Sequence, residues 1–456
     1  MKSNAELTEE YFQLADDLGG DIEGRRHAYD YMQHSTAIVH NKVVASSFIP
    51  KLFNHESWET MRYLAETTHR ILVKVIERYI EDPDYRHVFS FDKRLEELVL
   101  LPRGYQDVLP FARIDVFLNE DDMSCGFCEF NGDGSAGMNE NREITNSIVD
   151  SATFKRFCER HRVRDCELFE SWVREFIRIF EHSKYFVPGG RFAICDYLEC
   201  GVVDEFKVFS RYFAQYGYEC VVCDVRDLTF DGGMLCDQYG LPVHAIWRRC
   251  VTNDVLDHWD ESQALIEAVR HESVALIGSF AGHLVHDKQI FEVLRKPETK
   301  AFLTDEENAF IEEHVPRTVF LDKSEIDLDE VRSNKDAWII KPTDNYGARD
   351  VYAGISSTQK EWEQLIDRFA NGASGAPFIA QTYLTPFKTH TLPPDEGIEK
   401  LTDDEVDTKG KWYNNLSGLY LYNGHFQGVF SRLGPHPTIS KELEGMTAAT
   451  IRVEDR

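Results

Sequence analysis

The segment from about residue 188 to residue 278 alternates strand-like and helix-like patterns, and this alternation constrains the fold more than any other feature. Residues 192–195 have the pattern of a short buried strand, residues 203–216 that of an amphipathic helix, and residues 218–223 that of a second strand. A strand, a crossover helix and a second strand form a βαβ unit, whose two strands are parallel. The sequence therefore predicts an α/β protein that contains a Rossmann-like lobe.

The chain of 456 residues is too long for one ordinary core and long enough for two or three lobes. Apolar residues at helical spacing over 58–81 predict a mainly helical N-terminal region, 1–105. The next region, 106–187, begins with a hairpin and returns to amphipathic helix over 150–182. The Rossmann-like lobe covers 188–283. The last region, 284–456, contains two predicted strands, 337–341 and 378–383, and a helix, 358–370, between them.

Two segments near the C-terminus have distinctive patterns. Residues 388–411 are polar, with two prolines and many acids, and we expect them to form a mobile excursion. Residues 416–422 and 425–433 alternate like strands on either side of Asn423-Gly424, the dipeptide that favours a type I′ hairpin turn. The sequence therefore predicts a final hairpin.

The formal net charge of -29 constrains the possible partners. Such a surface repels nucleic acids and anionic lipids, so we expect neither as a partner. It also repels nucleotide phosphates, so a nucleotide site would need local positive charge. No run of 18 apolar residues occurs, the first ten residues contain no apolar segment, and the ten cysteines are scattered. This pattern is typical of reduced thiols in a cytoplasmic protein.

The hairpin near residue 122 contains the strongest candidates for chemistry. Residues 111–118 and 126–130 alternate like strands around the polar segment that separates them. A turn centred near Asp122 would put Asp115 opposite Glu129 and Arg113 opposite Asn131. Because opposed carboxylates repel each other, a cation should lie between them, and this oxygen set suits Mg²⁺. The alternative is a solvent-facing strand with an ion pair to Arg113.

Further candidates are cationic. Lys341 ends an apolar strand and precedes a loop with a glycine, so its ammonium and the loop N–H groups could hold phosphates; the alternative is a surface lysine before a turn. Lys288 is at the start of a predicted amphipathic helix, and the alternative to a phosphate contact is a solvent-facing position. Arg432, at the end of the last hairpin, could contact phosphate or pair with a surface acid. Arg248 and Arg249 are adjacent at a strand end and point opposite ways, so at most one of them serves a site.

The two Cys-x-x-Cys pairs, 125–128 and 220–223, lie about ninety residues apart, outside the usual zinc spacing. In a strand, the two cysteines of each pair would also face opposite sides. We therefore do not expect structural zinc.

The order of these motifs resembles a known family. Arg-x-Asp comes first, then Glu-x-Asn with a small-residue loop, a Rossmann-like lobe that ends in Trp-Arg-Arg, Asp-Lys, Lys-Pro with a glycine loop, and a late arginine. Over residues 105–440 this order is similar to that of the circularly permuted ATP-grasp proteins, which include the synthetase domain of glutathionylspermidine synthase. The resemblance implies an ATP-grasp-like α/β fold, circularly permuted, with a Rossmann-like lobe ahead of the ATP-binding lobes.

The resemblance also implies roles for residues that match the family's motifs. Asp115, Glu129 and Asn131 would hold one or two Mg²⁺ ions. Arg113 would stabilise the transferring phosphoryl group, and Arg432 would contact phosphate. Lys288 and Lys341 would bind the phosphates of ATP. The remaining nucleotide contacts would come from a phosphate loop and a strand that borders adenine: Asn345, Tyr346, Gly347, Ala348, Gln381, Tyr383 and Leu384.

The implied reaction is transfer of the γ-phosphoryl group of ATP to a substrate carboxylate, followed by attack of an amine on the acyl-phosphate. ATP and Mg²⁺ would be the cofactors, and a small carboxylate and an amine the substrates. The phosphate loop and the loop after Glu-Phe-Asn differ from those of the glutathionylspermidine synthases, so the resemblance does not extend to glutathione and spermidine. Two alternatives remain: a phosphotransferase on the same scaffold, and a non-catalytic nucleotide-binding protein.

Overall fold

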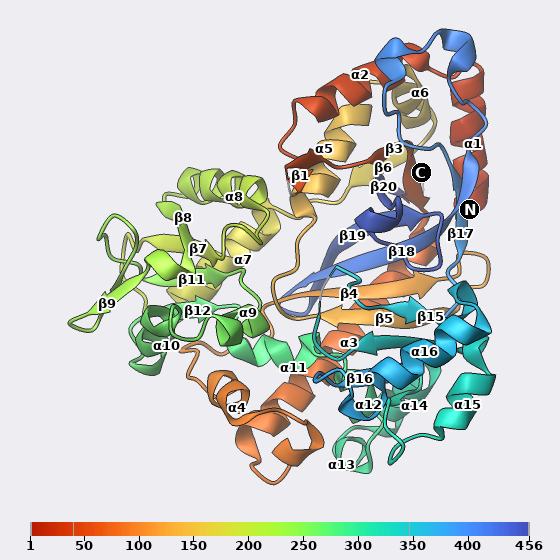
Figure 1. Ribbon diagram of the computed structural model, residues 1–456. Helices are drawn as coiled ribbons and strands as arrows, with labels where there is room; N and C mark the ends of the chain where they lie inside the picture. Colours follow the sequence, from red (N-terminus) through yellow and green to blue (C-terminus); the bar gives the residue numbers. More distant parts are fainter. Residues whose placement is uncertain (1, 40, 346, 455–456) are drawn as a thin grey trace.

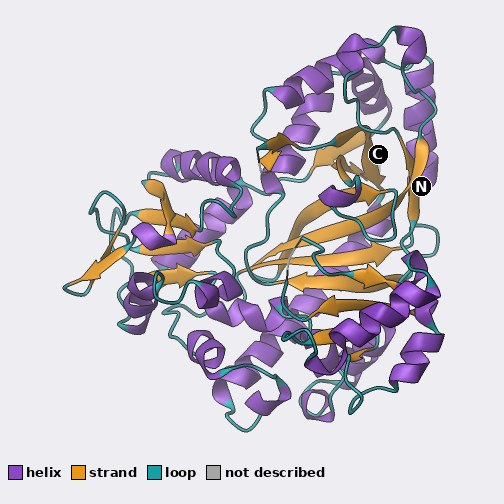
Figure 2. Cartoon of the chain, in the orientation of Figure 1, coloured by secondary structure: helices purple, strands orange, loops and turns teal. Residues whose placement is uncertain are grey.

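A computed structural model describes residues 2–39, 41–345 and 347–454 of the chain. It contains one eight-stranded sheet, two four-stranded sheets and two small hairpins, with helices around them (Figures 1 and 2). Within these ranges no helix is both long enough and apolar enough to cross a bilayer. The strands are β1 (Ile38–Val39), β2 (Lys42–Val43), β3 (Ser46–Phe53), β4 (Phe111–Leu118), β5 (Cys125–Asn131), β6 (Arg162–Asp165), β7 (Phe192–Asp196), β8 (Cys220–Asp224), β9 (Thr229–Asp231), β10 (Met234–Cys236), β11 (Ala245–Arg248), β12 (Ala275–Ile277), β13 (Thr318–Phe320), β14 (Trp338–Pro342), β15 (Tyr352–Ala353), β16 (Phe378–Thr382), β17 (Lys388–Thr391), β18 (Lys411–Tyr422), β19 (His425–Gly434) and β20 (Met446–Glu454).

The helices surround these sheets in Figure 1. They are α1 (Asn4–Asp16), α2 (Ile22–Gln33), α3 (His55–Glu81), α4 (Lys93–Val99), α5 (Met138–Ile148), α6 (Ala152–Arg160), α7 (Glu170–Glu181), α8 (Val203–Gln215), α9 (Thr252–Asp257), α10 (Gln263–Arg270), α11 (His283–His286), α12 (Ile290–Val293), α13 (Pro297–Lys300), α14 (Asp305–His314), α15 (Leu328–Ser333) and α16 (Gln359–Phe369).

The eight-stranded sheet joins early and late segments of the chain. Its main order is β3-β20-β19-β18-β4-β5, with β17 on β18 and β6 on β20. The early hairpin β4–β5 therefore continues the sheet that the late strands β18 and β19 begin, and Figure 1 shows these orange and blue strands side by side. The predicted final hairpin is confirmed, and both turn residues, Asn423 (φ 46°) and Gly424 (φ 81°), have the positive φ of a type I′ turn.

The predicted Rossmann-like lobe contains a four-stranded sheet with the order β12-β11-β7-β8. All three pairings are parallel, as the βαβ pattern requires, and α8 connects β7 to β8. The other four-stranded sheet is antiparallel, with the order β13-β16-β14-β15, and its apolar side packs against α15 and α16. The predicted strand–helix–strand order in this last region is also confirmed.

An aromatic cluster connects the parallel sheet to the eight-stranded sheet. The ring of Trp172, on α7, lies 4.9 Å from that of Phe111 on β4 and 5.3 Å from that of Trp247 on β11, measured between centroids. Tyr422, on β18, stacks on Phe111 at 5.5 Å. These side chains are fully buried or nearly so, and burying rings of this size contributes strongly to the stability of the core.

Three local predictions differ from the structure. The first hundred residues include β3, which pairs in parallel with β20, and the expected helical stretch 150–182 is interrupted by β6. The expected mobile excursion 388–411 is held in place: its first residues form β17, and Asp395 forms an ion pair with the buried Arg25 of α2. In each case a partner distant in sequence determines the structure, and no local pattern reports it.

Candidate active site

The hairpin β4–β5 has the predicted register at its functional end. Asp115 lies opposite Glu129, and Arg113 lies opposite Asn131. Nearer the turn the pairing shifts by one residue, so that Val116 faces Phe127 and Cys128 is the extra residue of a β-bulge. Bulges bend a strand and redirect side chains, and they are frequent next to functional sites.

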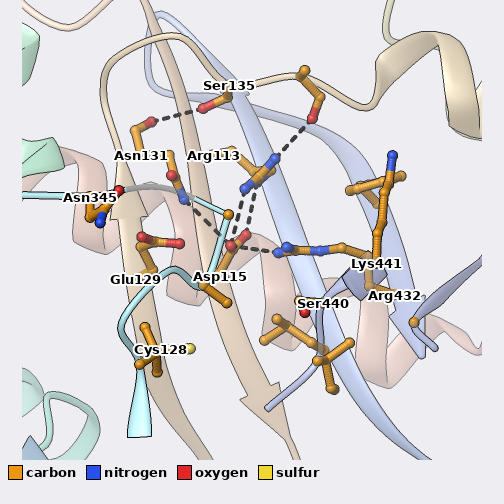
Figure 3. Close-up of a pocket in the computed structure, with 18 of the residues that line it drawn as sticks. Arg113, Asp115, Cys128, Glu129, Asn131, Ser135, Asn345, Arg432, Ser440 and Lys441 are labelled. Atoms are coloured by element: carbon orange, nitrogen blue, oxygen red, sulfur yellow. Dashed lines mark hydrogen bonds and ion pairs between the residues drawn. The ribbon is translucent and has the colours of Figure 1, made fainter. Parts of the chain in front are cut away.

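Asp115 is the centre of an arginine cluster (Figure 3). Its Oδ1 accepts a hydrogen bond from Arg113 Nε at 2.9 Å, and its Oδ2 accepts one from Arg113 Nη2 at 3.1 Å and one from Arg432 Nη2 at 2.5 Å. Burial by itself would lower the pKa of Arg113, but Asp115 outweighs it and the pKa rises. On the neighbouring strand β18, the residue opposite Asp115 is Gly418. A Cβ at Gly418 would lie 2.9 Å from Arg113 Cδ. A glycine at this position therefore leaves room for the arginine.

Glu129 is paired with Lys288. Lys288 Nζ lies 3.0 Å from Glu129 Oε1 and donates to the carbonyl of Asn345 at 2.8 Å. Burial alone would raise the pKa of Glu129, but the charge of Lys288 outweighs it and the pKa is lowered. The sequence predicts that Asp287 and Lys288 begin a helix, but the chain is extended at Asp287, between the short helices α11 and α12.

Lys341 extends from β14 toward the bulge in β5. Its Nζ donates to the carbonyl of Cys128 at 3.1 Å, so the extra residue of the bulge supplies an acceptor. Burial lowers the pKa of Lys341, and the nearby charge of Lys288 lowers it further. A buried ammonium of this kind gains from a bound anion, because an anion would compensate the cost of burying the charge.

The predicted phosphate loop and the strand β16 contribute further residues to the same region. Gly347 and Ala348 both have positive φ, 68° and 58°, and Tyr346 lies outside the described residues. Gln381 donates its side-chain amide to Thr318 Oγ1 at 2.8 Å, so that side chain is engaged within the sheet.

These elements enclose one cavity of about 390 Å³, a volume within the range of small-molecule sites. Every described residue of the predicted site lines it: Arg113, Asp115, Glu129, Asn131, Lys288, Lys341, Asn345, Gly347, Ala348, Gln381, Tyr383, Leu384 and Arg432. The structure thus brings together residues that are up to about 320 positions apart. It concentrates cations in one place on a strongly acidic chain, as a nucleotide site would require.

The cavity also contains residues outside the predicted nucleotide and metal ligands. Arg249 lines it, whereas its neighbour Arg248 forms an ion pair with Asp133, so one member of the arginine pair faces the cavity, as the alternation suggested. The segment 437–442 lines the opposite end, where Lys441 Nζ lies 2.8 Å from Glu140 Oε1. The sequence named Arg248 and Arg249 as a pair of which at most one serves a site, but no pattern in the sequence points to Lys441.

The side-chain oxygens of Glu129 and Asn131 fit a divalent cation better than those of Asp115 do. Both oxygens of Asp115 accept hydrogen bonds from arginines, and its side chain is only 1% exposed. Glu129 is 23% exposed, and Asn131 lies beside it on the cavity wall. Glu129 and Asn131 could therefore hold Mg²⁺, with phosphate oxygens and water as further ligands. Asp115 fits better as the residue that orients Arg113 and Arg432.

Among the solved structures, a glutathione synthetase-like effector from Globodera pallida, determined in its apo form, superposes on this chain with a TM-score of 0.57. The alignment covers 94% of this chain and 96% of the effector at 11% sequence identity. The fold is similar to that of a glutathione synthetase-like protein. A protein named as a putative gamma-glutamylcysteine synthetase, from Methylobacillus flagellatus, matches at a TM-score of 0.44 and 11% identity, over 82% of this chain and 87% of its own.

The second match is too weak to support an argument, and the first, at 11% identity, shows the fold alone. No family model matches the sequence, and no curated protein is significantly similar to it. The chemistry of the cavity therefore has to be argued from its own residues.

Proposed function

We propose that this protein is an ATP- and Mg²⁺-dependent ligase that joins a carboxylate to an amine through an acyl-phosphate. The observation that carries the proposal is the convergence of Arg113, Arg432, Lys288 and Lys341 with the oxygens of Glu129 and Asn131 in one cavity. Phosphoryl transfer needs positioned cations and a metal ion more than it needs a covalent catalyst. The similarity of the fold to a glutathione synthetase-like protein supports the same class of reaction.

In the proposed reaction, a carboxylate oxygen of the substrate attacks the γ-phosphorus of ATP, and the bond to the ADP oxygen breaks. The amine then attacks the acyl carbon, phosphate leaves, and the amine loses a proton. Lys288 and Lys341 hold phosphate oxygens, and the two arginines that Asp115 orients face the negative charge that develops during transfer. Glu129 and Asn131 would hold Mg²⁺, which would supply positive charge to the phosphates.

The adenine is proposed to lie against β16 and the two residues that follow it, Tyr383 and Leu384. Because the side chain of Gln381 is engaged with Thr318, recognition of the base falls to main-chain groups and apolar contacts. The loop Asn345–Ala348 would cover the phosphates, and its residues with positive φ allow close approach of backbone N–H groups.

The circular permutation and the region boundaries 1–105, 106–187, 188–283 and 284–456 are part of the same proposal. Its support is the position of β4 and β5, which precede the nucleotide-binding segments in the chain but extend the sheet formed by β18 and β19. A cytoplasmic location and small-molecule substrates without nucleic-acid or membrane partners also belong to the proposal.

The test is release of ADP by the full chain with Mg²⁺ and mixtures of carboxylates and amines. We expect release to require one compound of each class and an amide to form in equal amount, measured by mass spectrometry. A stable phosphorylated product without an amide would favour a phosphotransferase instead. ATP binding that is independent of Mg²⁺ and without turnover would favour a non-catalytic protein.

The lowered pKa of Lys341 gives a pH prediction. Only the protonated amine can hold phosphate, and its pKa in the free protein lies below the ordinary lysine value of 10.5. As the pH rises through this lowered pKa, kcat/KM for ATP should fall, and the fall should occur at a lower pH than it would for a lysine of ordinary pKa. Lys341→Arg keeps its charge and should move the alkaline fall to higher pH. An unchanged alkaline limb in this variant would contradict the assignment, and Lys207→Arg, at an exposed position of α8, is the matched control.

A further inference from the structure

A second group of potential metal ligands lies behind the wall that carries Lys288. His283, Asp287 and Asp344 each offer one ligand atom, and these atoms all lie within 4.8 Å of one another. His283 Nε2 is 3.8 Å from Asp344 Oδ2 and 3.9 Å from Asp287 Oδ2. A neighbouring histidine, His286, has its Nε2 4.0 Å from the other oxygen of Asp344.

The two histidines have unmet hydrogen-bonding capacity. Their side chains are 0% and 3% exposed, and among the described residues none accepts from or donates to any of the four ring nitrogens. Leaving a buried polar atom without a partner is unfavourable, because the atom loses its hydrogen bonds to water and gains none in return. A neutral imidazole can also bind a metal ion through one nitrogen, and the nearby carboxylates provide the negative charge that such an ion needs.

The distances are those of ligands spread around an ion. Two atoms that bind one ion at about 2.0–2.2 Å lie at most about 4.4 Å apart. The distances of 3.8 Å and 3.9 Å fall inside this limit, and the ligand atoms of Asp287 and Asp344 lie within 4.8 Å of each other.

We infer that His283, Asp287 and Asp344, with His286 at the edge, form a binding site for a divalent first-row transition metal ion such as Zn²⁺ or Mn²⁺. An imidazole nitrogen combined with carboxylate oxygens favours these ions over Mg²⁺, which prefers oxygen ligands alone. The general order of affinities also predicts tighter binding of Zn²⁺ than of Mn²⁺.

This site is separate from the proposed Mg²⁺ ligands. Asp287 is extended (φ -67°, ψ 128°), so its side chain and that of Lys288 point to opposite sides of the backbone. Lys288 and His286 line the cavity, whereas the three central ligands, His283, Asp287 and Asp344, are not among the described residues that line it.

The site connects two segments that hold the proposed phosphates. Asp344 directly precedes Asn345, whose carbonyl accepts from Lys288 Nζ, and the backbone N–H of Lys288 donates to the carbonyl of Thr343 at 2.7 Å. An ion bound by Asp287 and Asp344 would fasten the same two segments through side chains. It would therefore hold Asn345 in place and fix the position of Lys288.

The experiment uses the full chain after treatment with a chelator, without ATP, so that its result does not depend on the proposed ligase reaction. Zn²⁺ and Mn²⁺ are each titrated by calorimetry in the presence of excess Mg²⁺. We expect one ion per chain, with Zn²⁺ bound more tightly. His283→Gln and Asp344→Asn should each weaken Zn²⁺ binding by about 10²-fold or more. His271→Gln removes an exposed histidine and should leave the affinity unchanged.

A second readout follows the loop. Arg349 is exposed just beyond it, and Zn²⁺ should slow tryptic cleavage after Arg349 in the unsubstituted chain and in His271→Gln, but not in His283→Gln. If a substituted chain fails to fold, the effect of Zn²⁺ on cleavage of the unsubstituted chain still tests whether the ion binds here. The absence of stoichiometric Zn²⁺ binding, or equal affinity in both ligand variants and the unsubstituted chain, would overturn the inference in favour of ordered water between these groups.

Discussion

Glu129→Gln is expected to lower Mg²⁺-dependent ADP release by at least about 10²-fold, because an ion that acts as a Lewis acid contributes several kcal/mol to such a transition state. Glutamine has nearly the same size and can still accept a hydrogen bond from Lys288, which lies 3.0 Å from Glu129. The substitution therefore removes the negative charge with little change in packing. The measurement is the rate of ADP release at saturating substrates over a series of Mg²⁺ concentrations.

The binding of ATP without Mg²⁺ separates this effect from general damage to the site. Since the carboxylate repels phosphates, Glu129→Gln should retain or improve ATP affinity when no metal is present, while kcat falls. Glu9→Gln, at an exposed position of α1, is the matched control and should leave both quantities unchanged. Full turnover in Glu129→Gln at ordinary Mg²⁺ concentrations would refute the metal-binding role.

Arg248→Met is expected to lower the free energy of unfolding by about 3–5 kcal/mol, the usual cost of removing one partner from a buried ion pair. Arg248 Nη1 lies 2.6 Å from Asp133 Oδ1, and the two side chains are 0% and 1% exposed. The guanidinium also donates to the carbonyls of Gly278, Cys250 and Ser279. Methionine fills much of the space but leaves Asp133 as an uncompensated buried charge. The measurement is a denaturant titration.

A double variant tests this cause. Asp133→Asn removes the buried charge and keeps an oxygen that can accept from Thr252, so Arg248→Met with Asp133→Asn should be more stable than Arg248→Met alone. Arg174→Met, which breaks an exposed ion pair within α7, should cost at most about 1 kcal/mol. If Arg248→Met and Arg174→Met cost the same, burial of the pair does not determine its contribution.

The sequence predicts the site hairpin well because its signals are local. Alternation identifies the two strands, and the polar segment between them identifies the turn. The predicted register is correct at Asp115 and Glu129, but the pairs nearer the turn are one residue out of that register. The extra residue at the bulge, Cys128, accounts for the difference between the two parts of the hairpin. A single extra residue in a strand leaves no trace in the alternation of so short a segment, so the carbonyl that accepts from Lys341 could not be predicted.

Other parts of the fold depend on contacts between distant segments. Strand β6 is mostly exposed and owes its conformation to pairing with β20, almost 300 residues later. The order of motifs correctly brought Lys288, Lys341 and Arg432 to the same cavity as the hairpin. It did not indicate Lys441 or the segment 437–442, because a cavity wall made by an irregular loop has no periodic pattern. The histidine cluster was also missed, since its ligands come from two segments about sixty residues apart.

The position of β4 beside β18 has a consequence for how the protein folds during its synthesis. Asp115 pairs with Gly418, and Arg113 with Tyr420, about 300 residues later in the chain. At typical translation rates the early hairpin leaves the ribosome roughly 15–60 s before its neighbouring strand is made. During this time one edge of β4 has unpaired N–H and C=O groups, which is a risk of misassociation with other chains. We therefore expect newly made chains to need protection at this edge by a chaperone, until β18 has been made.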